Sequence, residues 1–117
     1  MCLKNVSEKK IAENDIIVYK FIININDKLL TPYYDDKIKI GKKYHSKLKF
    51  NYYNNITVGL HSFKNYLDTL LASKYYIGYF DNPDIKIVKC IIPKKSIYYE
   101  GVFNTFDVYT SFCIKQN

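Results

Sequence analysis

The residues of this chain best suited to chemistry are cations and aromatic rings that follow one another in its first half. Lysine ammonium groups hold phosphates as point charges, and tyrosine rings stack on bases, so such a cluster can bind an anionic partner. The sequence therefore predicts a binding surface made of Lys39, Lys43, His45, Lys47, Lys49, Tyr52 and Tyr53. An ordinary edge hairpin, whose lysines discourage aggregation, would show the same pattern.

The spacing within this surface depends on a strand predicted over residues 43–50. Successive side chains of a strand point to opposite faces of the sheet. The four cationic or titratable side chains between positions 43 and 49 would therefore line one face, opposite Tyr44 and Leu48.

Two histidines, His45 and His61, are the side chains whose ordinary pKa lies near neutrality. Together with a lysine, two imidazoles can cleave RNA without a metal, one acting as base and the other as acid. No local motif brings these two together, and we expect His61 at a junction between a strand and a helix. The sequence therefore predicts no catalytic site, and a two-histidine ribonuclease stays open as an alternative.

Cys2, Cys90 and Cys113 lack the paired spacing of a metal site or a redox motif. An odd number of cysteines behind a charged opening segment is typical of reduced thiols in the cytoplasm. Cys90 and Cys113 lie in apolar runs, so we expect both to be buried. The carboxylates fall mainly in turns and the glycines are not clustered, so the sequence predicts neither a metal nor a cofactor.

Composition narrows the classes of function that remain. The 117 residues carry a formal net charge of +7, and all 18 basic residues are lysines. Without arginine, any contact with nucleic acid would be directed to phosphates and sensitive to salt. Thirteen tyrosines favour a surface that binds a partner. The length indicates one domain, and no apolar run reaches the ~18 residues of a membrane span, so we expect a cytoplasmic protein.

Strand signals dominate the rest of the chain. Runs rich in β-branched and aromatic residues predict strong strands over 16–25 and 85–92, with the second in the centre of the sheet. Shorter strands are expected over 29–34, 37–40, 43–50, 56–62, 74–80, 97–101 and 102–115. The sequence predicts an α+β fold, a mostly antiparallel twisted sheet with one main helix packed on one face.

That helix is expected to follow Ser62 as its N-cap and to run for about three turns. Apolar side chains recur at helical spacing along it, namely Phe63, Tyr66, Leu67, Leu70 and Leu71. Gly101 is expected in a turn between the last two strands. The polar residues 1–14 predict a loose or briefly helical N-terminal arm, and residues 15–117 a single domain.

Four segments carry a resemblance to known proteins: VYKF at 18–21, IGKKY at 40–44, GLHSFKNYLDTLL at 59–71 and KIVKCIIPKKSIYYEG at 86–101. Together they resemble a group of small proteins from phages and mobile elements. The layout is also similar to phage anti-defence proteins that sequester the cyclic ADP-ribose-type signals of bacterial immunity, as in Thoeris systems. A weaker resemblance, to compact ADP-ribosyltransferases, would give Lys20, His61 and Glu100 the roles of the usual triad.

We therefore expect a small non-enzymatic inhibitor of phage type that acts in the cytoplasm of a bacterial host. It would bind a CRISPR-type nucleoprotein effector through the basic, tyrosine-rich surface, as an anti-CRISPR protein. Two alternatives stay open: a sponge for a cyclic nucleotide signal, and an enzyme of the ADP-ribosyltransferase or ribonuclease type. The expected partners are a host defence protein or nucleoprotein complex, nucleic acid phosphates or a cyclic nucleotide, and not a membrane.

Overall fold

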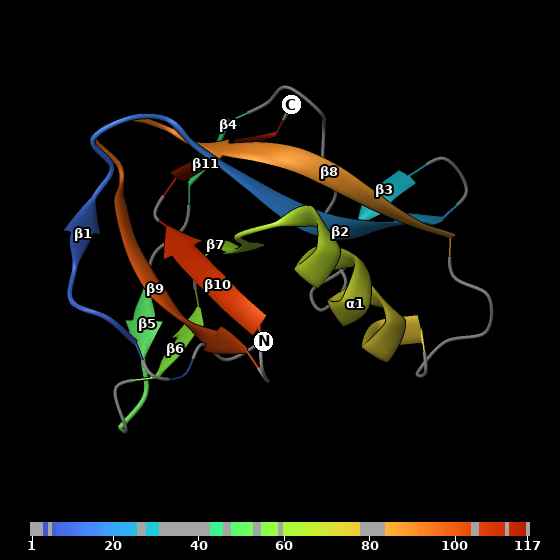
Figure 1. Cartoon of the computed structure of the whole chain (residues 1–117), viewed down its shortest axis with the longest axis horizontal. Coiled ribbons are helices and arrows are strands. Elements are labelled where there is room, and N and C mark those ends of the chain that lie inside the picture. The colour runs from blue at the N-terminus through green and yellow to red at the C-terminus, as the bar shows by residue number, and fades with distance from the viewer. Residues whose placement is uncertain are drawn as a thin grey trace.

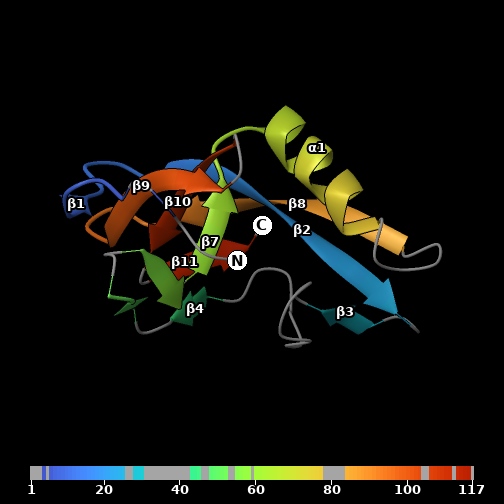
Figure 2. The same ribbon diagram turned by 90° about the horizontal axis from the view of Figure 1, so that it is seen from below.

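A computed structural model of the chain describes residues 4, 6–25, 28–30, 43–45, 48–52, 55–58, 60–77, 84–103, 106–111 and 113–116. The elements formed by these residues are β1 (Lys10–Ile11), β2 (Ile16–Ile25), β3 (Lys28–Leu30), β4 (Lys43–His45), β5 (Lys49–Phe50), β6 (Ile56–Val58), β7 (Leu60–Phe63), α1 (Tyr66–Ile77), β8 (Asp84–Ile92), β9 (Ile97–Phe103), β10 (Phe106–Ser111) and β11 (Cys113–Gln116). The pairs of strands are antiparallel, and α1 lies on one side of the main sheet (Figures 1 and 2). The expected α+β class, with a mostly antiparallel sheet and a helix, is confirmed.

β2 and β8 are the longest strands and the centre of the sheet. They pair without interruption from Ile16 opposite Ile92 to Asn24 opposite Asp84. Both were predicted from the strongest runs of β-branched and aromatic residues, and β8 lies between β2 and β11, inside the sheet as expected. Their length makes this pair the support on which the shorter strands and the helix assemble.

The short connection between β10 and β11 requires the sheet to curl. In the order of hydrogen-bonded neighbours, β7, β2 and β8 lie between them. A flat sheet would therefore set β10 and β11 about 19 Å apart, at ~4.8 Å per strand. One residue separates Ser111 at the end of β10 from Cys113 at the start of β11, and two residue steps span at most about 7 Å. The sheet therefore bends round until these strands meet, in line with the twist of β-strands.

The two faces of the sheet carry separate apolar clusters. On the face toward α1, the buried residues are Phe21, Ile23, Ile56, Phe63, Ala72 and Val108. On the other face they are Ala12, Val18, Cys90 and Ile92. Alternate residues of β2 supply both clusters, because successive side chains of a strand point to opposite faces. The long apolar run of β2 thus reflects a strand that is covered on both sides.

Asn65, and not Ser62, caps α1. The Asn65 Oδ1 atom accepts a hydrogen bond from the backbone N–H of Asp68 at 2.8 Å, and its Nδ2 atom donates to the Asp68 carboxylate at 3.1 Å. This satisfies one of the amide groups that a helix leaves free at its start. Ser62 lies instead in β7, whose pairing with β10 extends to Phe63 and delays the helix.

α1 also ends later than expected. The strand predicted over 74–80 is wrong for residues 74–77, which continue the helix; residues 78–80 lie outside the described residues. A nucleated helix gains one hydrogen bond for each residue added, and this overrides the β preference of its tyrosines. With 12 residues, α1 is shorter than a bilayer crossing requires, and no other described segment forms a helix that could cross.

Among the side chains that the structure describes, those that α1 buries are small. Thr69, Ala72 and Ser73 face the sheet, and both hydroxyl groups donate to backbone carbonyls within the helix region, at 2.8 and 2.6 Å. Small buried residues let the helix approach β2 and β8 closely. The larger Leu67 and Leu71, members of the stripe expected from the sequence, remain exposed.

Four strands differ from their predicted form. One of them is the strand expected over 102–115, which is divided among β9, β10 and β11. The predicted strands 43–50 and 56–62 are each divided between two sheets, because β4 pairs with β11 and β7 with β10 and β2, whereas β5 and β6 pair with each other. Gly101 is not in a turn but lies buried inside β9, opposite Val108 of β10. Of the strand expected over 29–34, Leu29 and Leu30 lie in β3, whereas residues 31–34 and 37–40 lie outside the described residues.

The N-terminal segment is not a loose arm where the structure describes it. β1 pairs with β9, and Lys4 forms a bridge with Val102 further along the same strand. Ala12 then clamps the turn between β8 and β9: its N–H donates to the Ser96 carbonyl at 2.9 Å and its carbonyl accepts from the Lys95 N–H at 2.7 Å. Lys95 has a positive φ of 74°, so this clamp holds a conformation that glycine would adopt more readily.

Candidate binding surface

β4 carries the part of the predicted surface that alternates as expected. Lys43 and His45 are exposed, while Tyr44 between them is half-buried and packs against the cluster around Val18. The strand is held by β11, with Tyr44 opposite Ile114. Because β4 stands at the end of the described sheet, its two polar side chains project from an edge and are open to a partner.

β5 and the turn that follows carry the next part of the surface. Lys49 is exposed, and Tyr52 is 95% exposed at the tip of the β5–β6 hairpin. The hairpin closes through Asn51, whose N–H donates to the Asn55 carbonyl at 2.8 Å and whose side-chain oxygen accepts from the Asn55 N–H at 3.0 Å. Phe50 anchors it to the main sheet by an edge-to-face contact with Tyr99, with ring centroids 5.4 Å apart.

The predicted surface is therefore spread over two sheets. Lys43 and His45 belong to the nine-stranded sheet of the described residues, and Lys49 to the two-stranded sheet. The single strand that was expected to align them is wrong, because the backbone changes partners between β4 and β5. The remaining members of the surface, Lys39, Lys47 and Tyr53, lie outside the described residues.

His61 has surroundings opposite to those of His45. It is buried in β7, which leads into α1 at the expected junction between strand and helix. Burial, together with nearby positive charge that includes Lys20, lowers the pKa of the His61 imidazole to about 3, so the ring is neutral at pH 7. In sheet order β2, β8 and β11 separate β7 from β4, so the two imidazoles are not on neighbouring strands.

Lys20 and Cys90 form an interior pair that sequence reasoning missed. Val18 lies opposite Cys90, and Lys20 opposite Val88, so Lys20 and Cys90 are diagonal neighbours on one face of the sheet. Burial lowers the pKa of the Lys20 ammonium and raises the pKa of the Cys90 thiol to about 11. The expectation that Cys90 is buried is confirmed; the side chain of Cys113 lies outside the description. The signal for Lys20 was its place as the single charge in the apolar run 16–25.

Glu100 is engaged in an ion pair with the N-terminal segment. Its carboxylate accepts from the Lys10 Nζ atom at 3.0 Å, and its backbone N–H donates to the Ser7 hydroxyl at 2.9 Å. The ion pair raises the pKa of Lys10. The ADP-ribosyltransferase resemblance would require Glu100 beside Lys20 and His61, and the contacts of Glu100 are with β1 and its flank instead.

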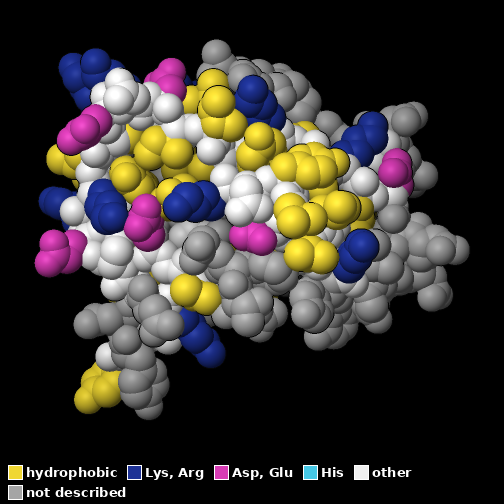
Figure 3. Space-filling view, viewed as in Figure 1, with side chains coloured by type: hydrophobic (Ala, Val, Ile, Leu, Met, Phe, Trp, Pro, Cys, Tyr) yellow, Lys and Arg dark blue, Asp and Glu magenta, His cyan; other side chains and the backbone are white. Residues whose placement is uncertain are grey.

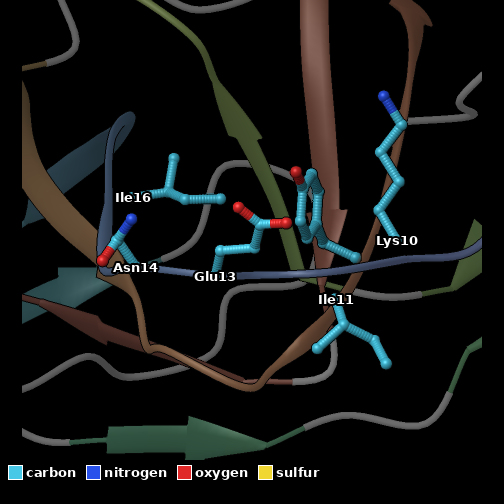
Figure 4. Close-up of a pocket in the computed structure, with 6 residues that line it drawn as sticks. Lys10, Ile11, Glu13, Asn14 and Ile16 are labelled. Carbon is cyan, nitrogen blue, oxygen red and sulfur yellow. The ribbon is translucent and has the colours of Figure 1, made fainter.

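An open depression lies next to this ion pair. It has a volume of about 480 Å³ and is lined by Lys10, Ile11, Glu13, Asn14, Ile16 and Tyr98. Figure 4 shows the Lys10 and Glu13 side chains extending to the same side of the segment, whereas Ile11 extends to the other side. The lining thus presents both signs of charge, and gives no preference for an anionic or a cationic ligand.

No family model, characterised protein or solved structure matches this chain. In the described residues no group of three histidine, cysteine, aspartate or glutamate side chains could hold a metal ion. The interior lysine, histidine and cysteine are held toward their uncharged forms, whereas the exposed strand edges offer cations and rings. This arrangement suits reversible binding of an anionic surface.

Proposed function

We propose that this chain is a non-enzymatic binding protein that docks on the anionic surface of a nucleoprotein, as a phage-type inhibitor of a bacterial defence complex. The observation that carries the proposal is the pattern on β4, where Lys43 and His45 project from the end of the described sheet while Tyr44 fixes the strand to the core. A net charge of +7 steers such a surface toward polyanions.

The β5–β6 hairpin extends the same chemistry. Lys49 adds a cation and Tyr52 adds an almost fully exposed ring, which can stack on a base or on a flat protein surface. Each cation in the proposed surface acts as a point charge, so binding is expected to weaken steeply as salt is raised.

The decisive experiment measures binding of the purified chain to purified RNA-guided effector complexes by biolayer interferometry. The Lys43→Glu/Lys49→Glu variant is expected to weaken binding at least tenfold. The matched control, Lys86→Glu/Lys94→Glu, changes two other exposed lysines by the same total charge and is expected to stay within twofold. Equal weakening by both pairs would mean that net charge alone drives binding and would overturn the proposed surface.

The same protein samples separate the other classes of function. Titration calorimetry with a panel of cyclic ADP-ribose-type nucleotides is expected to give no heat, and heat that Lys43→Glu/Lys49→Glu abolishes would replace the proposal with a nucleotide sponge. The His61→Gln variant is expected to keep full inhibitory potency, because this imidazole is buried and lies outside the proposed surface. Loss of potency in a folded His61→Gln variant that still binds the effector complex would instead indicate an enzyme.

A further inference from the structure

α1 presents three large apolar side chains to the outside. Leu67 is 61% exposed, Tyr66 54% and Leu71 39%, although the helix buries the much smaller Thr69 and Ala72. Leu67 and Leu71 are one turn apart and share a face, and Lys74 continues that face toward the end of the helix. An amphipathic helix of a self-contained domain normally has the reverse arrangement.

The exposed apolar surface continues from the helix onto β2. Tyr19 of β2 contacts Tyr66 edge to face, with ring centroids 5.9 Å apart. Ile17, two residues away on the same face of β2, is 49% exposed. Figure 3 shows hydrophobic side chains gathered over the region of α1. We name this surface the α1 patch; it consists of Ile17, Tyr19, Tyr66, Leu67 and Leu71.

Lysines surround the α1 patch. Lys64 precedes the helix, Lys74 lies on its exposed stripe, and Lys89 of β8 stands directly opposite Tyr19. All three are exposed, and within the described part of the chain none of them forms an ion pair. α1 itself carries one carboxylate, on Asp68, which accepts a hydrogen bond from Asn65. With three lysines against this one carboxylate, the rim of the patch has a net positive charge.

We infer that the α1 patch is a docking site for a protein that offers apolar side chains within an acidic rim. Four half-exposed side chains present on the order of 400 Å² of apolar surface, the size of a patch that is often functional. A second copy of the chain would bring lysines against lysines, since a two-fold dimer places the same rim on both sides. Charge complementarity thus selects an acidic partner over a copy of this chain.

This site is independent of the surface proposed above for nucleoprotein binding. In Figure 2, α1 lies above the sheet and β4 below it, so the two surfaces can be occupied at the same time. A chain that binds through both would join an acidic protein to a polyanionic complex.

The test uses the whole chain and a fluorescein-labelled 21-residue amphipathic peptide of leucine and glutamate, read by fluorescence anisotropy. The Leu67→Gln/Leu71→Gln variant, whose new residues favour helix, is expected to weaken binding at least tenfold. Lys64→Glu/Lys89→Glu is expected to weaken it at least threefold, and the control Lys86→Glu/Lys94→Glu to stay within twofold. In nuclear magnetic resonance spectra, the peptide is expected to shift the amide signals of α1 and to leave those of β4 unchanged.

Three results would overturn the inference. The first is equal affinity for a peptide of the same pattern made from leucine and lysine. The second is absence of binding at peptide concentrations up to 1 mM, or binding that ignores the Leu67→Gln/Leu71→Gln change. The third is a dimer, measured by light scattering, that this variant dissociates, because the patch would then serve a second copy of the chain.

Discussion

Lysine and histidine occur in two regions of this molecule with opposite surroundings. In the interior, Lys20 and His61 lie on strands at the centre of the sheet, and burial lowers the pKa of both side chains. At the edge, Lys43 and His45 occupy a three-residue strand and face water. The same two residue types are thus held toward neutrality in one place and left in contact with solvent in the other, and it is the packing around them that separates the two cases.

This difference in surroundings decides which side chains remain reactive. A side chain that is buried in an apolar cluster gains packing and loses reactivity, whereas an exposed one keeps its charge for an incoming partner. Cys90 extends the first group, since its thiol is fully buried between β-strands. Three experiments test this contrast, and they follow in decreasing order of the change that each should produce.

The largest effect concerns the reactivity of Cys90. In a Cys2→Ser/Cys113→Ser variant, Cys90 is the remaining thiol, and burial raises its pKa to about 11. We expect dithionitrobenzoate to react with it at least about 1000-fold more slowly in the folded chain than in urea, because a domain of ordinary stability opens fully in fewer than about one molecule in a thousand. As the control, Lys43→Cys in a chain without other cysteines should react at nearly the unfolded rate. Rapid labelling of folded Cys90 would show that the interior is accessible.

The second effect is a loss of stability in acid that arises from His61. An imidazole titrates near pH 6.5 in an unfolded chain, whereas in the folded chain His61 titrates near 3. Protons therefore favour the unfolded chain: the stability is complete above pH 6.5 and falls as the pH drops toward 3. By pH 5 the expected loss in the free energy of unfolding is about 2 kcal/mol, measured by urea denaturation at pH 7.5 and 5.0.

Two matched variants isolate this contribution. His61→Gln is expected to remove about 2 kcal/mol of the difference in unfolding free energy between the two pH values. His45→Gln, which removes the exposed imidazole of β4, is the matched control for the loss of a histidine. If the two variants gave the same pH dependence, burial of His61 would not be the cause.

The smallest effect compares two lysines. Replacing Lys20 by methionine keeps an apolar stem of similar length and removes an ammonium group that the interior disfavours, so Lys20→Met is expected to stabilise the fold by about 1 kcal/mol at pH 7. Lys43→Met changes an exposed side chain and is expected to stay within about 0.5 kcal/mol. Midpoints of urea denaturation give both values. A destabilised Lys20→Met chain would mean that the ammonium group has a favourable role in the interior.

The parts of the fold that could be predicted are those specified by local sequence. The runs of β2 and β8 are long and rich in β-branched residues, and both strands are present with the expected bounds to within a residue. The alternation of Lys43, Tyr44 and His45 was also correct, because it depends on strand geometry alone. The start of α1 was misplaced by three residues, since the serine at position 62 has the chemistry of an N-cap but is held in a strand by β10.

The parts that could not be predicted depend on which distant strands become neighbours. Residues 43–50 look like one strand until β11 binds their first part and β6 binds their last. Lys20 and Cys90 are 70 positions apart in the sequence and meet through the register of β2 with β8. The exposed leucines of α1 have helical spacing, but no local pattern tells which side of a helix will meet the sheet.

The position of β10 and β11 at the end of the sequence has a consequence for folding during synthesis. β10 pairs with β7, and β11 pairs with β8, although β10 and β11 are the last strands to be synthesised. During synthesis the edges of β7 and β8 that these strands cover remain unpaired until residues 106–116 have left the ribosome. A nascent chain stalled before that point would expose two unpaired strand edges, through which it could aggregate. Folding without aggregation therefore depends on prompt translation of the last strands or on a chaperone that covers the two edges.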